Sequence, residues 1–414
     1  MSRIQTTVLL LLSIFFSSWP SKAQDTVSRL DRILTATKIY QRVTTFFPDL
    51  SPTQFERDYR EYLGHILSSS DDRREFDLLS MAVVATLHDG HTWFFDQWLE
   101  KEHGQSVGFA AWPIGGKWVV VRSGIAALRT GDVIEEIDQT PTGLYFEHNR
   151  KYISASSDRD AGVSFFDTPV LFPERFVLTL DGNRHVTIDR AHDKKEEPSV
   201  KTEGRLLANG SVGYIRVPVF RGIATQAQAL EYFSGFHEAK AVILDVRSNP
   251  GLGDAGVLQR SLMDKSYQVW TEHSAMKGGT LLRHLGNANP ESVELTISGA
   301  SARPADPVYK GRLFILIDRG CTCACESFVG PFKFSKRAQL VGETTAGTYS
   351  ATNFTQFENG MMLNVASVRH TFPDGSRFEG VGVAPDVEVP TSIESLKAGR
   401  DIVLDRALAL AAER

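Results

Sequence analysis

The sequence predicts an α/β protein with a helical N-terminal part, a β-rich middle part and a C-terminal α/β part built on a mixed sheet. Three observations support this. Apolar residues recur with a period near 3.6 in residues 24–104, short β-type segments lie between turns in 105–200, and apolar strands alternate with helices in 201–414. A chain of 414 residues is too long for one hydrophobic core, so we expect two or three domains.

Residues 1–23 have the pattern of a secretory signal peptide. An apolar run at 8–16 follows a positive charge, and the small residues Ser21 and Ala23 precede a cleavage site at Gln24. The run is too short to span a bilayer permanently, and a buried N-terminal helix is the alternative. The sequence therefore predicts an exported protein, periplasmic or secreted, with no integral membrane segment after signal cleavage.

The segment 24–104 is predicted to hold three helices. Asp25 or Ser28 can cap the first, and Ser51 can cap the second, which has proline at its first turn. The third, "DRREFDLLSMAVVATL", is hydrophobic all round and should be buried. It ends at "HDGHTWFF", where Gly90 supplies a turn.

Shorter β-type segments follow in 105–200, among them "KWVVVR", "DVIEEID", "RFVLTL" and "HVTIDR", and a charged linker lies at 191–200. In 201–414 the strands "AVILDV" and "GRLFILID" are apolar throughout, which is typical of a sheet covered on both faces. Sites in such sheets form beyond the carboxyl ends of the strands. The turns "RSNPGLGD" and "RGCTCACE" follow those two ends.

All three cysteines of the chain lie in the second of these turns, "RGCTCACESF". Cys321 and Cys325 can pair locally if the backbone turns sharply, or they can simply pack; a metal cluster is the less favoured alternative because the spacing is too tight for zinc. Cys323 precedes a predicted helix, whose N-terminus would favour a nucleophile and a developing oxyanion. Packing alone would explain the same residues equally well.

Three other features have simple structural explanations when taken singly. His88 and His91 flank an Asp-Gly turn and can be a base, a metal pair lacking a third ligand, or structural residues. The "SNPG" turn at Gly251 can offer backbone N–H groups or be only a turn. Glu379 in "FEGVGVAPDVEV" can orient a histidine or lie on the surface. The formal net charge of −5 argues against general nucleic-acid binding.

Six motifs, in their order along the chain, resemble those of the C-terminal processing (tail-specific) peptidases. They are "LHDGHT", "GYIRVPVF", "ILDVRSNPG", "DRGCTCACESF", "LVGETTAG" and "FEGVGVAPDVEV". The nearest branches are those of the tricorn core protease and the chlamydial protease-like activity factor. The resemblance covers most of 80–390 and implies a ClpP/crotonase-like catalytic core at 201–414. "SGIAALRTGDVIEEIDQTPTG" is similar to part of a PDZ domain, which implies a PDZ-like middle domain that binds peptide by strand addition.

The resemblance also implies site residues. The family's nucleophilic serine stands three residues before a glutamate, which places Cys323 at the serine position before Glu326; a register shift of one would place Ala324 there and imply an inactive chain. The lysine of the Ser-Lys branches would stand at Thr348 and is absent. His91 and Glu379 match the base and its orienter in the other branches.

The oxyanion hole implied by the resemblance consists of the N–H groups of Gly251 and Ala324, although Leu252 replaces the second glycine usual in the family. The implied function is an exported endopeptidase acting on polypeptides by acyl-enzyme catalysis, with no metal and no organic cofactor. Whether the chain oligomerises stays open. Three interpretations of Cys323 stay open: it is a working thiol nucleophile, it marks a degenerate protease that only binds peptide, or it is an altered active-site residue, natural or engineered. The alternative function is an inactive homologue that binds peptides or hydrophobic ligands.

Overall fold

The structure is a computed structural model that describes residues 25–192, 200–276, 293–297, 301–305 and 309–413. The predicted signal peptide and most of the predicted linker at 191–200 lie outside the described residues. Among the helices that are described, none is both long and apolar enough to cross a membrane.

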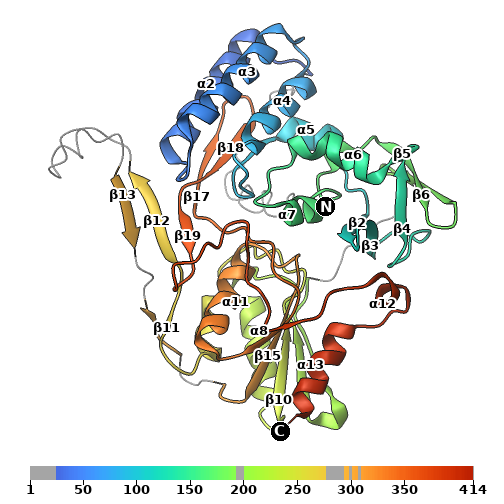
Figure 1. Cartoon of the computed structure of the whole chain (residues 1–414), viewed down its shortest axis with the longest axis vertical. Coiled ribbons are helices and arrows are strands. Elements are labelled where there is room, and N and C mark those ends of the chain that lie inside the picture. Colours follow the sequence, from blue (N-terminus) through green and yellow to red (C-terminus); the bar gives the residue numbers. More distant parts are fainter. Residues whose placement is uncertain (1–24, 193–199, 277–292, 298–300, 306–308, 414) are drawn as a thin grey trace.

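Three helices form the N-terminal part at the top of Figure 1, as predicted: α2 (Arg29–Phe46), α3 (Pro52–Ser68) and α4 (Arg73–Ala85). Ser28 caps α2, because its hydroxyl accepts a hydrogen bond from the Asp31 N–H at 3.1 Å. Proline stands at the first position of α3, where its missing N–H costs nothing.

A small antiparallel sheet joins these helices to a distant part of the chain. Its order is β1–β18–β17, with bounds β1 (Trp93–Asp96), β17 (Thr352–Gln356) and β18 (Met361–Ala366). Met361, Leu363 and Val365 are fully buried in the same core as the N-terminal helices. The sequence patterns do not predict this sheet. Its consequence is that residue 91, just before β1, is held beside the C-terminal part.

The middle part is an antiparallel sheet in the order β2-β3-β4-β6-β7, with β5 beside β4. Its strands are β2 (Phe109–Ile114), β3 (Lys117–Ser123), β4 (Val133–Ile137), β5 (Thr140–Pro141), β6 (Arg175–Leu180) and β7 (Arg184–Asp189). Helices α5 (Gln97–His103), α6 (Thr142–Asn149) and α7 (Asp158–Ser164) and the turns η1 (Arg150–Tyr152) and η2 (Pro169–Leu171) accompany it. Phe165, Phe166 and Phe172 lie in mutual contact at the centre of its core.

The C-terminal part is built on a six-stranded sheet in the order β20-β16-β15-β10-β9-β8. All neighbouring strands are parallel except β8 and β9, so the sheet is mixed, as predicted. The strands are β8 (Glu203–Leu207), β9 (Val212–Arg216), β10 (Ala241–Asp245), β15 (Arg312–Ile317), β16 (Gln339–Gly342) and β20 (Val387–Glu388).

Helices cover both faces of this sheet (Figure 1). Ile315 and Ile317 of β15 face a core shared with α8 (Gly222–Gly235), α9 (Gly256–Leu262) and α11 (Ala324–Ser335), whereas Leu316 faces α13 (Ile402–Ala412). Alternate residues of one strand are therefore buried on opposite faces, which explains why the strand is apolar throughout.

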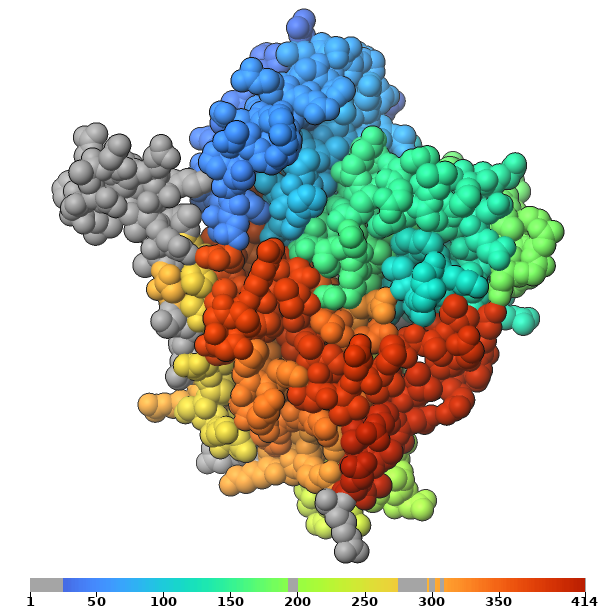
Figure 2. Space-filling view, in the orientation of Figure 1, coloured from blue at the N-terminus to red at the C-terminus, as the bar shows by residue number. Residues whose placement is uncertain are grey.

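The remaining described elements lie outside the six-stranded sheet. They are η3 (Ala208–Gly210), β11 (Tyr267–Gln268), β12 (Thr271–Met276), β13 (Val293–Ile297), β14 (Ser301–Ala302), β19 (Arg369–Thr371) and α12 (Ile393–Lys397). The N-terminal, middle and C-terminal parts touch one another over a continuous surface in the space-filling view (Figure 2). Residues from all three parts can therefore contribute to one site.

Candidate active site

The cysteine turn connects the carboxyl end of β15 to the start of α11. Cys323 immediately precedes the helix and holds φ 56° and ψ −122°, a conformation that residues other than glycine rarely adopt. Its N–H donates to the Thr348 carbonyl at 3.0 Å, and its own carbonyl accepts from the Glu326 N–H at 2.9 Å. The side chain is thereby turned out of the core at the helix N-terminus.

His91 and Cys323 come together although 232 residues separate them. His91 Nε2 lies 3.3 Å from Cys323 Sγ, and both residues are only partly exposed. The histidine backbone is fixed on two sides, by its N–H donating to Asp89 Oδ1 at 2.9 Å and by its carbonyl accepting from Asn364 Nδ2 at 2.7 Å. Asn364 belongs to β18, so the small sheet positions the imidazole. His88, by contrast, is exposed.

Thr348, rather than Glu379, is the hydrogen-bond partner of the other ring nitrogen. Thr348 Oγ1 lies 3.0 Å from His91 Nδ1. The hydroxyl can accept from Nδ1–H, which leaves Nε2 unprotonated toward the sulfur. The resemblance would place the lysine of the Ser-Lys branches at Thr348. The motif spacing indicates only that a lysine is absent there, and the 25-residue separation from Cys323 is the one sequence signal that points to Thr348.

Glu379 lies near the histidine but acts on its backbone. Its carboxyl accepts from the Ser156 hydroxyl and, at 3.4 Å, from the Tyr349 N–H. Ser156 Oγ in turn accepts from the Gly90 N–H at 2.8 Å, one residue before His91. Burial, with a further contribution from Asp89, raises the pKa of Glu379 to about 9, so this carboxyl is neutral at pH 7.

Glu326 anchors the loop that carries Thr348. It is fully buried and accepts from the Thr345 hydroxyl, from the Gly347 N–H at 2.7 Å and from the Thr348 N–H at 2.9 Å. Burial raises its pKa to about 8, and the three donors oppose that rise. The glutamate that marks the motif in the sequence is thus a structural link between helix α11 and the histidine's partner.

The two predicted oxyanion donors lie side by side. Gly251 has φ +79°, and a Cβ added to it would lie 2.6 Å from the Ala324 nitrogen, so only glycine fits. Its N–H donates to Asn249 Oδ1 at 2.8 Å and is therefore already used. Ala324 is the first residue of α11, where an N–H has no acceptor within the helix. Leu252 adopts φ 70°, which fits the glycine usual at that position in the family.

Cys321 and Cys325 form a disulfide with their Cα atoms 5.5 Å apart, and Cys323 is the free cysteine. Of the alternatives for this cluster, the structure has the local pair. In the described part of the chain, no group of three or more histidine, cysteine, aspartate or glutamate residues is arranged to hold a metal ion.

Both partners of the Cys323–His91 contact are uncharged at neutral pH. Burial, with a contribution from His370, lowers the pKa of His91 to about 4. Burial also raises the pKa of the Cys323 thiol to about 11, although the Ala324 N–H opposes the rise. The arrangement is a thiol beside a neutral base, not a thiolate–imidazolium pair.

This has a measurable consequence for Cys323 alkylation. Because the folded-state pKa lies above the ordinary value of about 8.5, the reactive thiolate should form only as the pH approaches 11. We expect the iodoacetamide alkylation rate of Cys323 to rise steadily between pH 7 and 10, while that of glutathione levels off near pH 9. A rate already at its plateau at pH 6 would indicate an ion pair and contradict this prediction.

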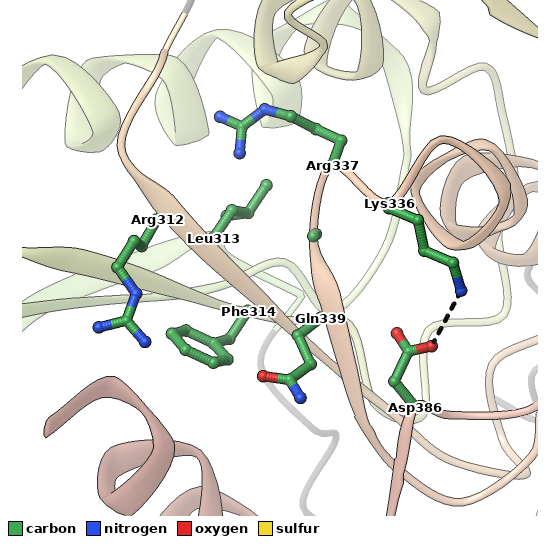
Figure 3. A pocket seen from close by; sticks show the side chains of 8 residues that line it. Arg312, Leu313, Phe314, Lys336, Arg337, Gln339 and Asp386 are labelled. Atoms are coloured by element: carbon green, nitrogen blue, oxygen red, sulfur yellow. Dashed lines mark ion pairs between the residues drawn. The ribbon is translucent and has the colours of Figure 1, made fainter. Parts of the chain in front are cut away.

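A separate pocket of about 370 Å³ lies at the other end of the sheet, at the amino ends of β15 and β16 (Figure 3). Three cations line it, but each has a partner. Arg312 donates to the carbonyl of Glu413 at 2.7 Å, Arg337 donates to that of Gly311 at 3.1 Å, and Lys336 lies 3.9 Å from Asp386. None of the residues that line this pocket belongs to the site at Cys323.

Comparison with known proteins agrees with the resemblance read from the motifs. The sequence profile of peptidase family S41 matches residues 211–389. A chloroplastic C-terminal processing peptidase of Tetradesmus obliquus is 29% identical over 286 residues, covering 66% of this chain and 56% of that protein. A probable CtpA-like serine protease of Staphylococcus aureus (strain N315) is 26% identical over 200 residues, covering 48% and 37%. The chain thus matches about half or less of the length of these curated relatives.

Solved structures extend the likeness to the fold. Mature CPAF complexed with lactacystin superposes with a TM-score of 0.71 at 13% identity, covering 92% of this chain and 98% of that chain. The photosystem II D1 C-terminal processing protease gives 0.53 at 20% identity, covering 91% and 99%. Residues 211–389 are therefore similar to peptidase family S41, and the chain shares the fold of these solved peptidases over most of its length.

Proposed function

We propose that this chain is an exported endopeptidase of the C-terminal processing type that uses Cys323 as its nucleophile. The observation that carries the proposal is the 3.3 Å contact between Cys323 Sγ and His91 Nε2 at the N-terminus of α11. The match of residues 211–389 to peptidase family S41 supports the reaction class. The polypeptide substrate is proposed on the same ground, with the middle part as a PDZ-like peptide-binding domain.

The proposed reaction begins with a coupled proton transfer and attack. His91 Nε2 takes the Cys323 proton as Sγ attacks the scissile carbonyl carbon, and the resulting oxyanion lies toward the Ala324 N–H. Protonated His91 then gives the proton to the leaving amine, and an acyl thioester remains on Cys323. Water activated by His91 hydrolyses this thioester and restores the thiol.

Two other residues have proposed positioning roles. Thr348 holds the imidazole in the tautomer that leaves Nε2 free to accept a proton, and Glu379 fixes the turn before His91 through Ser156. The triad implied by the resemblance therefore becomes Cys323, His91 and Thr348 in direct contact, with Glu379 behind them. Gly251 contributes by allowing close approach to Ala324.

Export is proposed from the signal-peptide pattern at 1–23. The Cys321–Cys325 disulfide supports it, because structural disulfides persist in oxidising compartments and are rare in the cytosol. Periplasmic and fully secreted locations fit equally well.

The test of the proposed function is turnover of an unfolded protein. Reduced, carboxymethylated casein is incubated with the purified chain, and cleavage products and acid-quenched adducts on Cys323 are identified by mass spectrometry. We expect new peptide ends together with a thioester-linked acyl group on Cys323. Casein that binds but stays intact, with Cys323 unmodified, would instead favour an inactive homologue that binds peptides.

Thr348→Val tests the positioning role at Nδ1. Valine keeps the shape of threonine but cannot accept the Nδ1–H bond, so we expect kcat to fall about 10- to 100-fold with little change in KM. Thr344→Val, in the same loop, is the matched control. Equal activity of the two variants in a steady-state peptide assay would remove Thr348 from the mechanism.

A further inference from the structure

The three cysteines share one turn, with Cys321 and Cys325 on its buried side and Cys323 on its partly exposed side. Cys321 and Cys325 are disulfide-bonded, and both are completely buried in the core beneath α11. Cys323, the middle residue of the bridged segment, is partly exposed, with its sulfur 3.3 Å from the His91 ring. The disulfide therefore links the residues on either side of Cys323 and leaves the Cys323 thiol free to face His91.

Cys323 needs such a restraint because of its backbone. With φ 56° and ψ −122° it occupies a sparsely populated region, which persists only where the surroundings fix it. Hydrogen bonds fix part of the turn, such as Cys321 N–H to the Asp318 carbonyl at 3.0 Å and Cys325 N–H to the Thr322 carbonyl at 3.0 Å. The disulfide adds a covalent link between the residues two before and two after Cys323.

The same link spans the proposed oxyanion donor. Ala324 and Cys325 are the first two residues of α11, whereas Cys321 lies in the loop after β15. The bridge thus ties the helix N-terminus to the strand end. In the sequence, Cys323 and Ala324 both lie between the two bridged cysteines.

We propose that the Cys321–Cys325 disulfide positions the catalytic turn, so that the peptidase is fully competent only when this bond is formed. The inference rests on the proposed function, since it assigns Cys321 and Cys325 a role in that reaction. Loss of the bond lets Cys323 relax toward a common backbone conformation, which moves its sulfur away from His91 and the Ala324 N–H away from the oxyanion.

Global stability should depend far less on this bond. A disulfide that closes a loop of only a few residues removes little conformational freedom from the unfolded chain. The buried sulfurs can also be replaced by small apolar groups in the same core. The main effect is therefore expected in kcat rather than in Tm.

The experiment compares the wild-type chain with the double variant Cys321→Ala/Cys325→Ala. Single variants are avoided because each leaves a free thiol that can pair with Cys323. We expect kcat to fall about 100-fold, the scale of a misplacement of about 1 Å at a reacting group, with KM within about threefold. Val329→Ala, fully buried on the same helix, is the matched control and should keep wild-type kcat.

A second measurement separates this inference from the proposed function. Labelling of Cys323 by a peptidyl chloromethyl ketone should be slowed by His91→Ala in the wild-type background but not in the double-variant background. This labelling measurement needs no turnover. If the wild-type protein fails to cleave casein, that result counts against the proposed function, while the labelling rate still reports whether Cys323 lies beside His91. A double variant with wild-type kcat and unchanged dependence of labelling on His91 would overturn the inference. So would a non-reducing peptide map of active enzyme in which Cys321 and Cys325 are unpaired.

Discussion

Replacing Cys323 with alanine is expected to lower peptide hydrolysis by about 10⁴- to 10⁶-fold. The methyl group cannot form the acyl intermediate, and His91 then has no proton to accept. The fold should survive, because the Cys323 side chain is partly exposed and its sulfur lies toward His91. Steady-state kinetics and a thermal melt of the same preparation measure the two effects separately.

Two further variants make this prediction sharper. His91→Ala should cause a comparable loss, and the double variant should be no worse than either single one, because the two residues act as one unit. Cys323→Ser is the conservative control; it restores the nucleophile of the serine-type relatives and should exceed the alanine variant in activity. Wild-type turnover in Cys323→Ala would show that the chemistry lies elsewhere.

Replacing Glu326 with alanine is expected to lower the free energy of unfolding by about 4 kcal/mol. The change leaves three buried donors without their acceptor, and each such loss costs about 1–3 kcal/mol. Because the Thr348 N–H is one of these donors, kcat should fall as well. Urea denaturation followed by circular dichroism measures the stability change.

Glu326→Gln is the matched control for that experiment. Its amide oxygen can still accept from the Thr345 hydroxyl and the Gly347 N–H, but the amide nitrogen then faces the Thr348 N–H. We expect an intermediate loss of stability. A change below about 1 kcal/mol in Glu326→Ala would mean that water replaces the carboxyl and that the loop does not depend on it.

The sequence predicts those features that depend on local pattern or on motif spacing. The mixed sheet and the N-terminal helices follow from apolar periodicity, and the order of the motifs predicts Cys323 and His91 as site residues, which lie 3.3 Å apart in the structure. Helix capping by Ser28 was one of two alternatives that the sequence offered. These inferences need only neighbouring residues or the resemblance to a family.

Contacts between distant segments could not be predicted in this way. The pairing of β1 with β18 joins strands more than 260 residues apart, and nothing in either strand identifies its partner. For the same reason, the role of Thr348 at His91 Nδ1 and the bond from the Gly251 N–H to Asn249 are visible only in three dimensions. A motif can place Glu379 near the site without revealing that its direct contact is Ser156.

The sheet formed by β1, β18 and β17 has a consequence for biosynthesis. His91 is translated long before the strand that holds its carbonyl, since Asn364 lies 273 residues later in the chain. While the chain is emerging, its base and its thiol belong to segments that have not yet met. The contact between His91 and Cys323 is therefore expected to form only after the strand at 361–366 has docked onto the N-terminal helices, so the proposed activity would appear only when synthesis is nearly finished.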